Sequence, residues 1–252
     1  MLIKSLKWYK RLNARKGRIE AGAFLVEGYK AILQIINTHP GEIIEILSTK
    51  ELSPLYHNFS IRIISEDQIR SICNTKSPQG IIAVIRSPID IYSSHLPVNV
   101  NGNILLLDDI QDPGNVGTLI RTAAAFNFVG VILTEKCADP LSPKCVQSTT
   151  GAILSLWIRR TNRYLELAEE LKGSGYSLAA ADVDGREAPS LLCRMDRLLL
   201  ALGSEASGLS KSIIDASNYK IRIPINREKA ESLNVAACGA ICMHMAFQNS
   251  LS

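Results

Sequence analysis

The segment from residue 104 to residue 133 limits most strongly what this chain can fold into. It begins with an unbroken apolar run at 104–107, which is typical of a strand buried on both faces of a parallel sheet. A polar, turn-forming stretch follows, then an expected helix over 116–126 and a second strand over 129–133. A strand, a helix and a parallel strand make one right-handed crossover unit. The segment therefore predicts an α/β fold with a parallel sheet.

Two polar residues of this segment lie where ligands bind in such sheets, near the carboxyl ends of the strands. Asn115 is expected in the turn after the first strand, and Arg121 inside the following helix. An arginine in an otherwise apolar helix needs a partner, and either a ligand or an ordinary surface salt bridge supplies one. Both interpretations of Arg121 stay open on this segment alone.

Length and composition indicate a packed protein without a membrane span. The 252 residues allow one large or two modest domains, and 46% of them are apolar. No apolar run approaches the roughly 20 residues of a membrane span, and the charged start is unlike a secretory signal peptide. Cys238 and Cys242 lie four apart on an expected helix, but two ligands are too few for structural zinc. We expect reduced thiols, no metal site and a cytoplasmic location.

Positive charge is concentrated at the start of the chain. The net charge is +4, yet the first 18 residues hold seven basic residues and no acidic one. Positions 4, 7, 11, 15 and 18 follow helical spacing and predict one helix with a basic stripe, near Trp8 and Tyr9. Basic side chains with aromatic rings suit a phosphate backbone and stacked bases. The alternative is a solvated helix face with Trp8 packed inward.

The first half of the chain predicts a small α/β unit. Ser65 and Gln68 have the spacing of a capping box and predict a helix start. Residues 87–103 are rich in Pro, Ser, Asn and Gly and predict a linker, so we place the domain boundary near residue 98, between domains of residues 1–98 and 99–252. The strands are expected at 23–26, 43–47, 61–64 and 81–85, and a further helix at 29–36.

The second half alternates between strands and helices, which favours a mostly parallel sheet. Its strands are expected at 104–107, 129–133, 177–181, 197–202 and 219–223. Its helices are expected near 116–126, 142–153, 164–173, 210–216 and 232–248.

Two further stretches of this half carry polar groups at strand ends. Gly203 and Gly208 have the spacing of a phosphate loop, but Leu209 stands where such a loop has its lysine, which disfavours a nucleotide-phosphate enzyme. A plain tight turn is the alternative. Farther on, Ser232 is predicted to cap the last helix. Asn234 is not needed for that cap and is a candidate site residue.

These stretches together resemble the three motifs of the SpoU (TrmH-type) branch of the SPOUT methyltransferases. The resemblance extends upstream to the ends of that family's amino-terminal RNA substrate domain, so it covers nearly the whole chain. The matching residues are Asn115 with Arg121, the turn 203–208, Ile223 and Pro224 followed by 232–235, and upstream 24–28 and 77–84.

The resemblance implies a two-part α/β fold, with a small amino-terminal α/β RNA substrate-binding domain and a parallel-sheet domain that contains a deep trefoil knot. It also implies S-adenosylmethionine as cofactor, in a pocket lined by Gly203, Ile223 and Leu233. The implied reaction is methyl transfer to a ribose 2′-hydroxyl of structured RNA. Family enzymes work as homodimers, and the apolar last helix offers a surface for such a contact or for an intramolecular one.

By the resemblance, Arg121 is the catalytic residue. A guanidinium is always protonated, so we expect it to hold the adjacent phosphate and lower the pKa of the hydroxyl electrostatically. Asn115, Glu205, Ser232 and Asn234 would orient Arg121 and the ribose. The loop 226–230 is one residue longer than is usual in the family and lacks its glycine, which affects the shape of the pocket.

The additional amino-terminal domain favours ribosomal RNA over transfer RNA as substrate, by analogy with the family's minimal members. The alternative function is an RNA-binding protein whose knotted domain is catalytically idle. The intact residues at the motif positions argue against that alternative.

Overall fold

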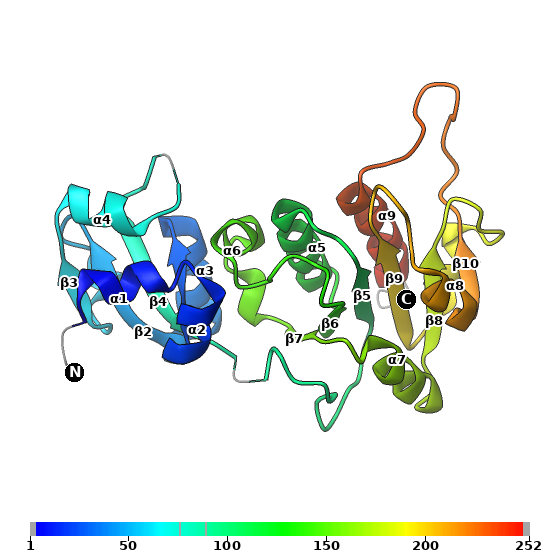
Figure 1. The fold of residues 1–252 in the computed structure, drawn as a ribbon, viewed down its shortest axis with the longest axis horizontal. Helices are drawn as coiled ribbons and strands as arrows, with labels where there is room; N and C mark the ends of the chain where they lie inside the picture. Colours follow the sequence, from blue (N-terminus) through cyan, green and yellow to red (C-terminus); the bar gives the residue numbers. More distant parts are fainter. Residues whose placement is uncertain (1–3, 76, 89, 249–252) are drawn as a thin grey trace. The chain divides into compact units, whose positions relative to one another are not determined.

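The computed structural model describes residues 4–75, 77–88 and 90–248 (Figure 1). The chain forms two compact units. The amino-terminal unit consists of Met1–Ile89 with Asp139–Leu154, and the carboxyl-terminal unit of Asp90–Ala138 with Ser155–Ser252. A segment from the middle of the chain thus folds with its beginning. No helix among the described residues is long and apolar enough to cross a membrane.

The amino-terminal unit contains a four-stranded mixed sheet of order β1-β4-β2-β3, in which β1 and β2 run antiparallel to β4. The capping box before α4 forms as predicted, because Gln68 N donates to Ser65 Oγ at 3.2 Å and Ser65 N to Gln68 Oε1 at 2.9 Å. The strands are β1 (Ala23–Glu27), β2 (Ile43–Ser48), β3 (Ile61–Ile63) and β4 (Ile81–Arg86). The helices are α1 (Leu6–Arg11), α2 (Arg15–Ala21), α3 (Tyr29–Thr38), α4 (Glu66–Ile72) and α6 (Pro143–Thr149), with short 3-10 turns η1 (Pro40–Glu42), η2 (Pro54–Tyr56) and η3 (Ala152–Leu154).

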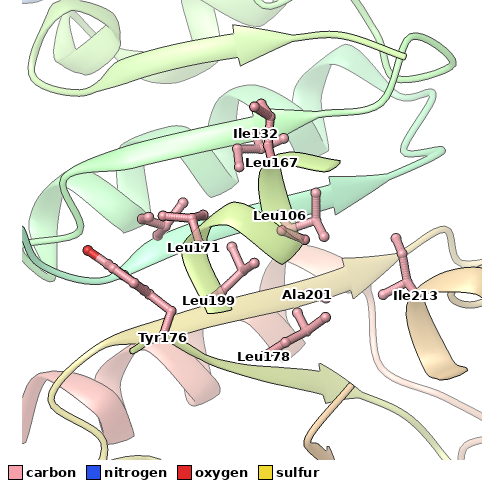
Figure 2. Close-up of a cluster of buried hydrophobic side chains, with 11 residues drawn as sticks. Leu106, Ile132, Leu167, Leu171, Tyr176, Leu178, Leu199, Ala201 and Ile213 are labelled. Atoms are coloured by element: carbon pink, nitrogen blue, oxygen red, sulfur yellow. The ribbon is translucent and has the colours of Figure 1, made fainter. Parts of the chain in front are cut away.

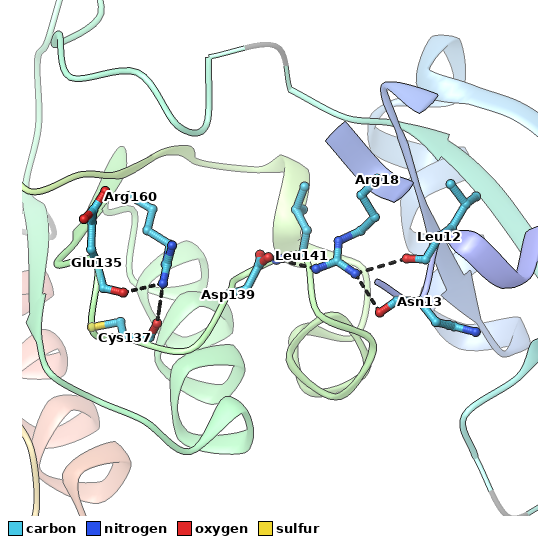
Figure 3. A network of polar contacts seen from close by, with 8 residues as sticks. All are labelled: Leu12, Asn13, Arg18, Glu135, Cys137, Asp139, Leu141 and Arg160. Atoms are coloured by element: carbon cyan, nitrogen blue, oxygen red, sulfur yellow. Dashed lines mark hydrogen bonds and ion pairs between the residues drawn. The ribbon is translucent and has the colours of Figure 1, made fainter. Parts of the chain in front are cut away.

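The prediction of one basic helix over the first 18 residues is wrong. The chain breaks between α1 and α2, and the two helices approach so closely that a side chain at Gly17 would meet the carbonyl oxygen of Arg11. Arg18 is only 2% exposed and donates to Asp139 Oδ2 at 2.8 Å and to the carbonyl oxygens of Leu12 and Asn13 at 3.0 Å each (Figure 3). Arg18 is therefore a buried structural residue and cannot belong to an exposed stripe.

Tyr9 is also buried, and it makes the unit sensitive to alkaline pH. Its hydroxyl donates to Glu45 Oε2 at 2.6 Å, and burial together with this bond raises the pKa of Tyr9 to about 12. The unfolded phenol ionises near pH 10, so the group stabilises the fold below pH 10, and this contribution is lost as the pH rises towards 12.

We expect Tyr9→Phe to cost roughly 1.5–3 kcal/mol of unfolding free energy at pH 8 and to remove part of the pH dependence of stability between pH 10 and 12. Urea unfolding of the wild type and the variant at pH 8 and pH 11 measures both effects. If the free energy of unfolding fell equally in the two proteins between these pH values, the assignment would be contradicted.

The carboxyl-terminal unit is built on a six-stranded sheet of order β10-β8-β9-β5-β6-β7, and every neighbouring pair is parallel. This confirms the predicted α/β fold with a parallel sheet. One strand, β7, was not expected from the sequence. The strands are β5 (Ile104–Asp108), β6 (Gly130–Leu133), β7 (Trp157–Arg160), β8 (Ser177–Ala181), β9 (Leu198–Gly203) and β10 (Tyr219–Ile221).

Helices cover both faces of this sheet. They are α5 (Pro113–Ala125), α7 (Tyr164–Gly173), α8 (Lys211–Ala216) and α9 (Val235–Gln248), with a 3-10 segment η4 (Pro189–Arg194). Figure 2 shows α7 and α8 packing on one face, where Leu171 and Ile213 meet Leu199 and Ala201 of β9. Because successive strand residues point to opposite faces, the residues of β9 that alternate with Leu199 and Ala201 face the other side of the sheet.

The helices α5 and α9 lie on the other face. A side chain at Gly239 of α9 would meet both Leu119 of α5 and Leu202 of β9, and Leu202 alternates with the residues that face α8. The adjacent strands β5 and β9 are thus followed by helices on opposite faces. Such a switch point opens a crevice at the carboxyl ends of the two strands, where ligands bind in this kind of sheet.

Candidate active site

Three residues from separate parts of the chain form one hydrogen-bonded cluster. Asn115 Nδ2 donates to Glu205 Oε1 at 3.2 Å, and Asn234 Nδ2 lies 2.6 Å from the same oxygen and 3.2 Å from Asn115 Oδ1. These residues lie 90 and 119 positions from Asn115 in sequence. We call Asn115, Glu205 and Asn234 the amide–carboxylate cluster. It joins the three stretches that the sequence singled out.

The local structure places Asn115 differently from the prediction. The helix α5 begins at Pro113, three residues earlier than expected, and Asp112 caps it by accepting from Asn115 N at 2.9 Å. Asn115 therefore lies in the first turn of α5 and not in the preceding loop. Proline suits the first position of a helix, because its missing N–H would have no partner there.

Asn234, not Ser232, caps the last helix, so the predicted cap is wrong. The helix α9 begins at Val235, and Asn234 Oδ1 accepts from the backbone N–H of Ala236 at 2.9 Å and of Ala237 at 3.3 Å. Glu205 Oε1 also accepts from Val235 N at 3.1 Å. A carboxylate at the amino end of a helix is favoured by the helix dipole. The cluster thus fixes the start of α9 against the turn that follows β9.

Arg121 lies on the exposed side of α5. It follows Asn115 by six residues, which places it about 9 Å farther along the helix axis and about 120° around it. Both residues therefore come from one rigid helix, but they point in different directions. The helix presents a guanidinium at the surface, at a fixed spacing from the amide–carboxylate cluster.

The turn 203–208 is closed by its own backbone. Ser204 N donates to Gly208 O at 3.1 Å, and Gly208 N donates to Ser204 O at 2.9 Å. Gly208 has a φ of +66°, and a side chain at Gly203 would lie 2.2 Å from the backbone of Gly208. Only glycine fits these two positions. The tight-turn interpretation is correct, and the turn also holds Glu205 in the cluster.

A cavity of about 490 Å³ lies beside this turn, within the roughly 300–1,000 Å³ range of small-molecule sites. Gly203 and Leu233 line it, while Ile223 lines an adjoining groove of about 90 Å³ that shares Ser232 and Leu233 with the cavity. The three residues predicted to bind the cofactor therefore gather in one place. We call the cavity and its groove together the knot-side cavity, after the knot that the resemblance implies at the cofactor site.

The residues of the knot-side cavity fit S-adenosylmethionine chemically. Val183 is 55% exposed there, which leaves an apolar surface for an adenine ring. Asp182, Asp184 and Glu205 place carboxylates around it, and these favour a ligand that carries a sulfonium and an ammonium group. Cys238 also lines both parts, and a hydrogen bond from the neighbouring Cys242 thiol lowers the pKa of Cys238.

A second cavity, of about 380 Å³, opens at the switch point between β5 and β9. It is lined by Asp108, Asp109, Thr134, Glu135, Lys136, Asn162, Tyr164 and residues 207–210. The sequence did not predict this switch-point cavity, because its residues follow four different strands and none belongs to a recognisable motif. Strand order alone could have indicated it, once β5 and β9 were known to be neighbours.

The amino-terminal unit has a cavity of its own, of about 590 Å³, with Lys50 and Arg70 among its lining residues. Beside it Tyr29 N donates to Gln79 Oε1 at 3.2 Å, and Lys50 Nζ lies 5.8 Å from the centre of the Tyr29 ring. Glu66 lines this cavity as well and pairs with Arg70 at 3.3 Å. The two stretches that resembled the ends of an RNA substrate domain, 24–28 and 77–84, meet beside it, where β1 pairs with β4.

Family comparisons agree with this geometry. A model of the SpoU rRNA methylase family matches residues 102–244, more than half of the chain, and a model of the MRM3-like substrate binding domain matches residues 3–83. The chain belongs to the SpoU rRNA methylase family. The knotted SPOUT fold, S-adenosylmethionine as methyl donor and methyl transfer to the ribose 2′-hydroxyl of RNA go with this family. The predicted family, fold, reaction and cofactor are thereby confirmed.

Individual relatives span almost the whole chain. The 23S rRNA (guanosine(2553)-2′-O)-methyltransferase RlmP of Bacillus subtilis is 29% identical over 242 residues, which cover 95% of this chain and 94% of the relative. The 23S rRNA (uridine(2479)-2′-O)-methyltransferase of Streptomyces viridochromogenes is 28% identical and covers 98% and 90%. The crystal structure of the SpoU methyltransferase AviRb from Streptomyces viridochromogenes with AdoMet superimposes with a TM-score of 0.84, 25% identity and 98% coverage of both chains.

Proposed function

We propose that this SpoU-family enzyme methylates a ribose 2′-hydroxyl in ribosomal RNA of the large subunit. The observation that carries the proposal is the amide–carboxylate cluster, which joins three distant motif stretches beside a cavity of suitable size and chemistry. The names of the relatives, which specify 23S rRNA, support the class of RNA. When bound, S-adenosylmethionine supplies an electrophilic methyl group on a sulfonium.

The protein must make a poor nucleophile reactive, because a neutral ribose hydroxyl is hard to deprotonate. Arg121 is exposed on α5 and carries a permanent positive charge. We assign it the task of holding the phosphate next to the target ribose. A cation fixed there stabilises the developing oxyanion and so lowers the pKa of the hydroxyl. Arg121 therefore acts electrostatically and not as a base.

Asn115, Glu205 and Asn234 are assigned to position the site. The amide of Asn115 donates to Glu205 and receives a bond from Asn234, which fixes its orientation. Glu205 Oε1 receives three donors and ties the turn 203–208 to the start of α9. Ser232, at the border of cavity and groove, is left to contact the cofactor or the ribose. Gly203, Ile223 and Leu233 would hold the cofactor through their backbone and apolar surfaces.

The amino-terminal unit is proposed to hold the RNA outside the reaction centre. Its match to a substrate-binding domain and its cavity lined by Lys50 and Arg70 both support this role.

The domain boundary near residue 98 stays a prediction. The cytoplasmic location stays a prediction too, which a ribosomal substrate supports. An idle RNA-binding protein is the alternative function; the intact cluster and the open knot-side cavity favour the enzyme over it.

A homodimer also stays a prediction. Part of the apolar surface of α9 is used inside the chain, since Phe126, the residue that follows α5, lies 5.7 Å from Phe247, ring centre to ring centre. Ile241 on the same helix is 39% exposed and offers apolar surface to a second copy. Sedimentation equilibrium at micromolar concentration would detect the dimer, and a monomer alone would count against it.

The function is tested by methyl transfer to defined RNA. The purified chain is incubated with S-adenosylmethionine labelled in the methyl group and with ribosomal RNA from cells that lack the gene. We expect one alkali-resistant, 2′-O-methylated nucleotide in large-subunit RNA and no label in transfer RNA. Calorimetric binding of S-adenosylmethionine without any transfer would favour the idle alternative, and label in transfer RNA would contradict the substrate class.

A further inference from the structure

The switch-point cavity has no role in the methyl transfer described above, although it lies at the place where ligands bind in such sheets. It measures about 380 Å³ and begins where β5 ends, at Asp108, whose register partner on β9 is Gly203. It shares Ser207, Gly208 and Leu209 with the knot-side cavity. The two cavities are therefore separated by a single turn of the chain.

The walls of the switch-point cavity are held by specific bonds. Arg160 of β7 donates to the carbonyl oxygens of Glu135 and Cys137, as Figure 3 shows, and so holds the loop that carries Glu135. Asp108 is 5% exposed, and its Oδ2 accepts from Ser210 N at 2.7 Å. A cavity whose walls are fixed in advance loses little conformational freedom when it binds a ligand.

Asp109 adds a strained backbone to this wall. Its φ is +54°, a region that residues other than glycine seldom adopt. The strain is maintained by a bond from Asp109 N to Thr134 Oγ1 at 3.0 Å, and its carboxylate accepts from Gln111 Nε2 at 3.0 Å. Strain of this kind concentrates at functional sites. The bonds keep the carboxylate at the cavity wall.

The lining residues indicate what the ligand must offer. Asp108, Asp109 and Glu135 bring three carboxylates, which only accept hydrogen bonds when ionised. The ligand should therefore present N–H donors. Tyr164, which is partly buried against the core of the unit, brings an aromatic ring to the cavity wall, and Lys136 adds a positive charge suited to a phosphate.

Guanine fits these demands better than the other RNA bases. Its pairing edge presents N1–H and the N2 amino group side by side, so that one carboxylate can accept both in parallel, as it does from arginine. Uracil presents a single N–H between two carbonyl oxygens, and a carboxylate repels these oxygens. Adenine and cytosine each offer one amino group beside a ring acceptor.

We infer that the switch-point cavity binds an unpaired guanine of the RNA substrate, with Glu135 or Asp109 on its pairing edge and Tyr164 on its face. The inference rests on the proposed function, which it deepens by naming a base. The base would then lie one turn of chain away from the methyl-donor site.

The test uses the full chain without S-adenosylmethionine and with the 5′-monophosphates GMP, AMP, CMP and UMP as probes, titrated by NMR because single nucleotides bind weakly. We expect GMP to bind at least fivefold more tightly than the other three. Glu135→Gln or Asp109→Asn should weaken GMP binding about tenfold and leave UMP unchanged. The matched control is Glu170→Gln, an exposed carboxylate on α7 outside both cavities, which should change nothing.

A second pair of variants keeps the test independent of charge. Tyr164→Ala should weaken GMP binding about tenfold through the lost stacking, and Tyr164→Phe should retain it. Equal binding of GMP and UMP, or GMP binding that neither carboxylate variant weakens, overturns the inference. Methyl transfer by the same wild-type preparation is measured in parallel: transfer without a GMP preference refutes only the guanine cavity, and a GMP preference without transfer supports the cavity and refutes the proposed function.

Discussion

Replacing Arg121 by alanine should lower methyl transfer by on the order of 100- to 1,000-fold, the usual effect of removing one stabiliser of a developing oxyanion. Affinity for S-adenosylmethionine should be unchanged, since Arg121 lies on α5 and does not line the knot-side cavity. Single-turnover transfer to ribosomal RNA measures the first effect, and calorimetry measures the second. If Arg121 lowers the pKa of the hydroxyl, the loss should shrink as the pH rises.

Two variants control this result. Arg121→Lys keeps the charge but not the planar pair of donors that matches a phosphate, so we expect an intermediate rate. Arg194→Ala removes another exposed arginine of the same unit, on η4 outside both cavities, and should leave the rate unchanged. Turnover of Arg121→Ala close to that of the wild type would reject the catalytic assignment.

Replacing Asp139 by asparagine should destabilise the amino-terminal unit by about 3 kcal/mol, the lower end of the cost of breaking a buried ion pair. The side chains of Arg18 and Asp139 are only 3% and 13% exposed, so the change leaves the Arg18 charge buried without its carboxylate. Asparagine can still accept from Leu141 N, as Asp139 Oδ1 does at 2.9 Å, which isolates the loss of charge. The partners are drawn in Figure 3.

Urea unfolding of a Trp157→Phe background measures this effect, because Trp8 of the amino-terminal unit is then the only tryptophan left. Adding Arg18→Met to Asp139→Asn removes the unpaired charge and should restore part of the lost stability. The matched control is Arg11→Ala, which breaks a pair with the exposed Glu20 and should cost less than about 1 kcal/mol. Equal losses for Asp139→Asn and Arg11→Ala would show that the buried pair contributes no more than a surface pair.

Much of the site was predictable because its signals are local. Glycine at 203 and 208 is required by the closed turn, and the family model matches one continuous range, residues 102–244, which contains all three motif stretches. The convergence of Asn115, Glu205 and Asn234 was predictable only through the resemblance. No spacing rule states that residues 90 and 119 positions apart share hydrogen bonds. The switch-point cavity was not predictable, because it depends on which strands are neighbours.

The sequence alone is enough to predict the α/β class, most strands and helices to within a few residues, and the capping box of Ser65 with Gln68. Hydrophobic period and capping are properties of adjacent residues. The three-dimensional fold was needed to show that Arg18 is buried against Asp139, 121 residues later, and that Asn234 caps α9 in place of Ser232. It also decided that Asp139–Leu154 folds with the amino-terminal unit. The partner of a charge, and the unit to which a segment belongs, depend on contacts between residues far apart in the chain, and these leave no local pattern.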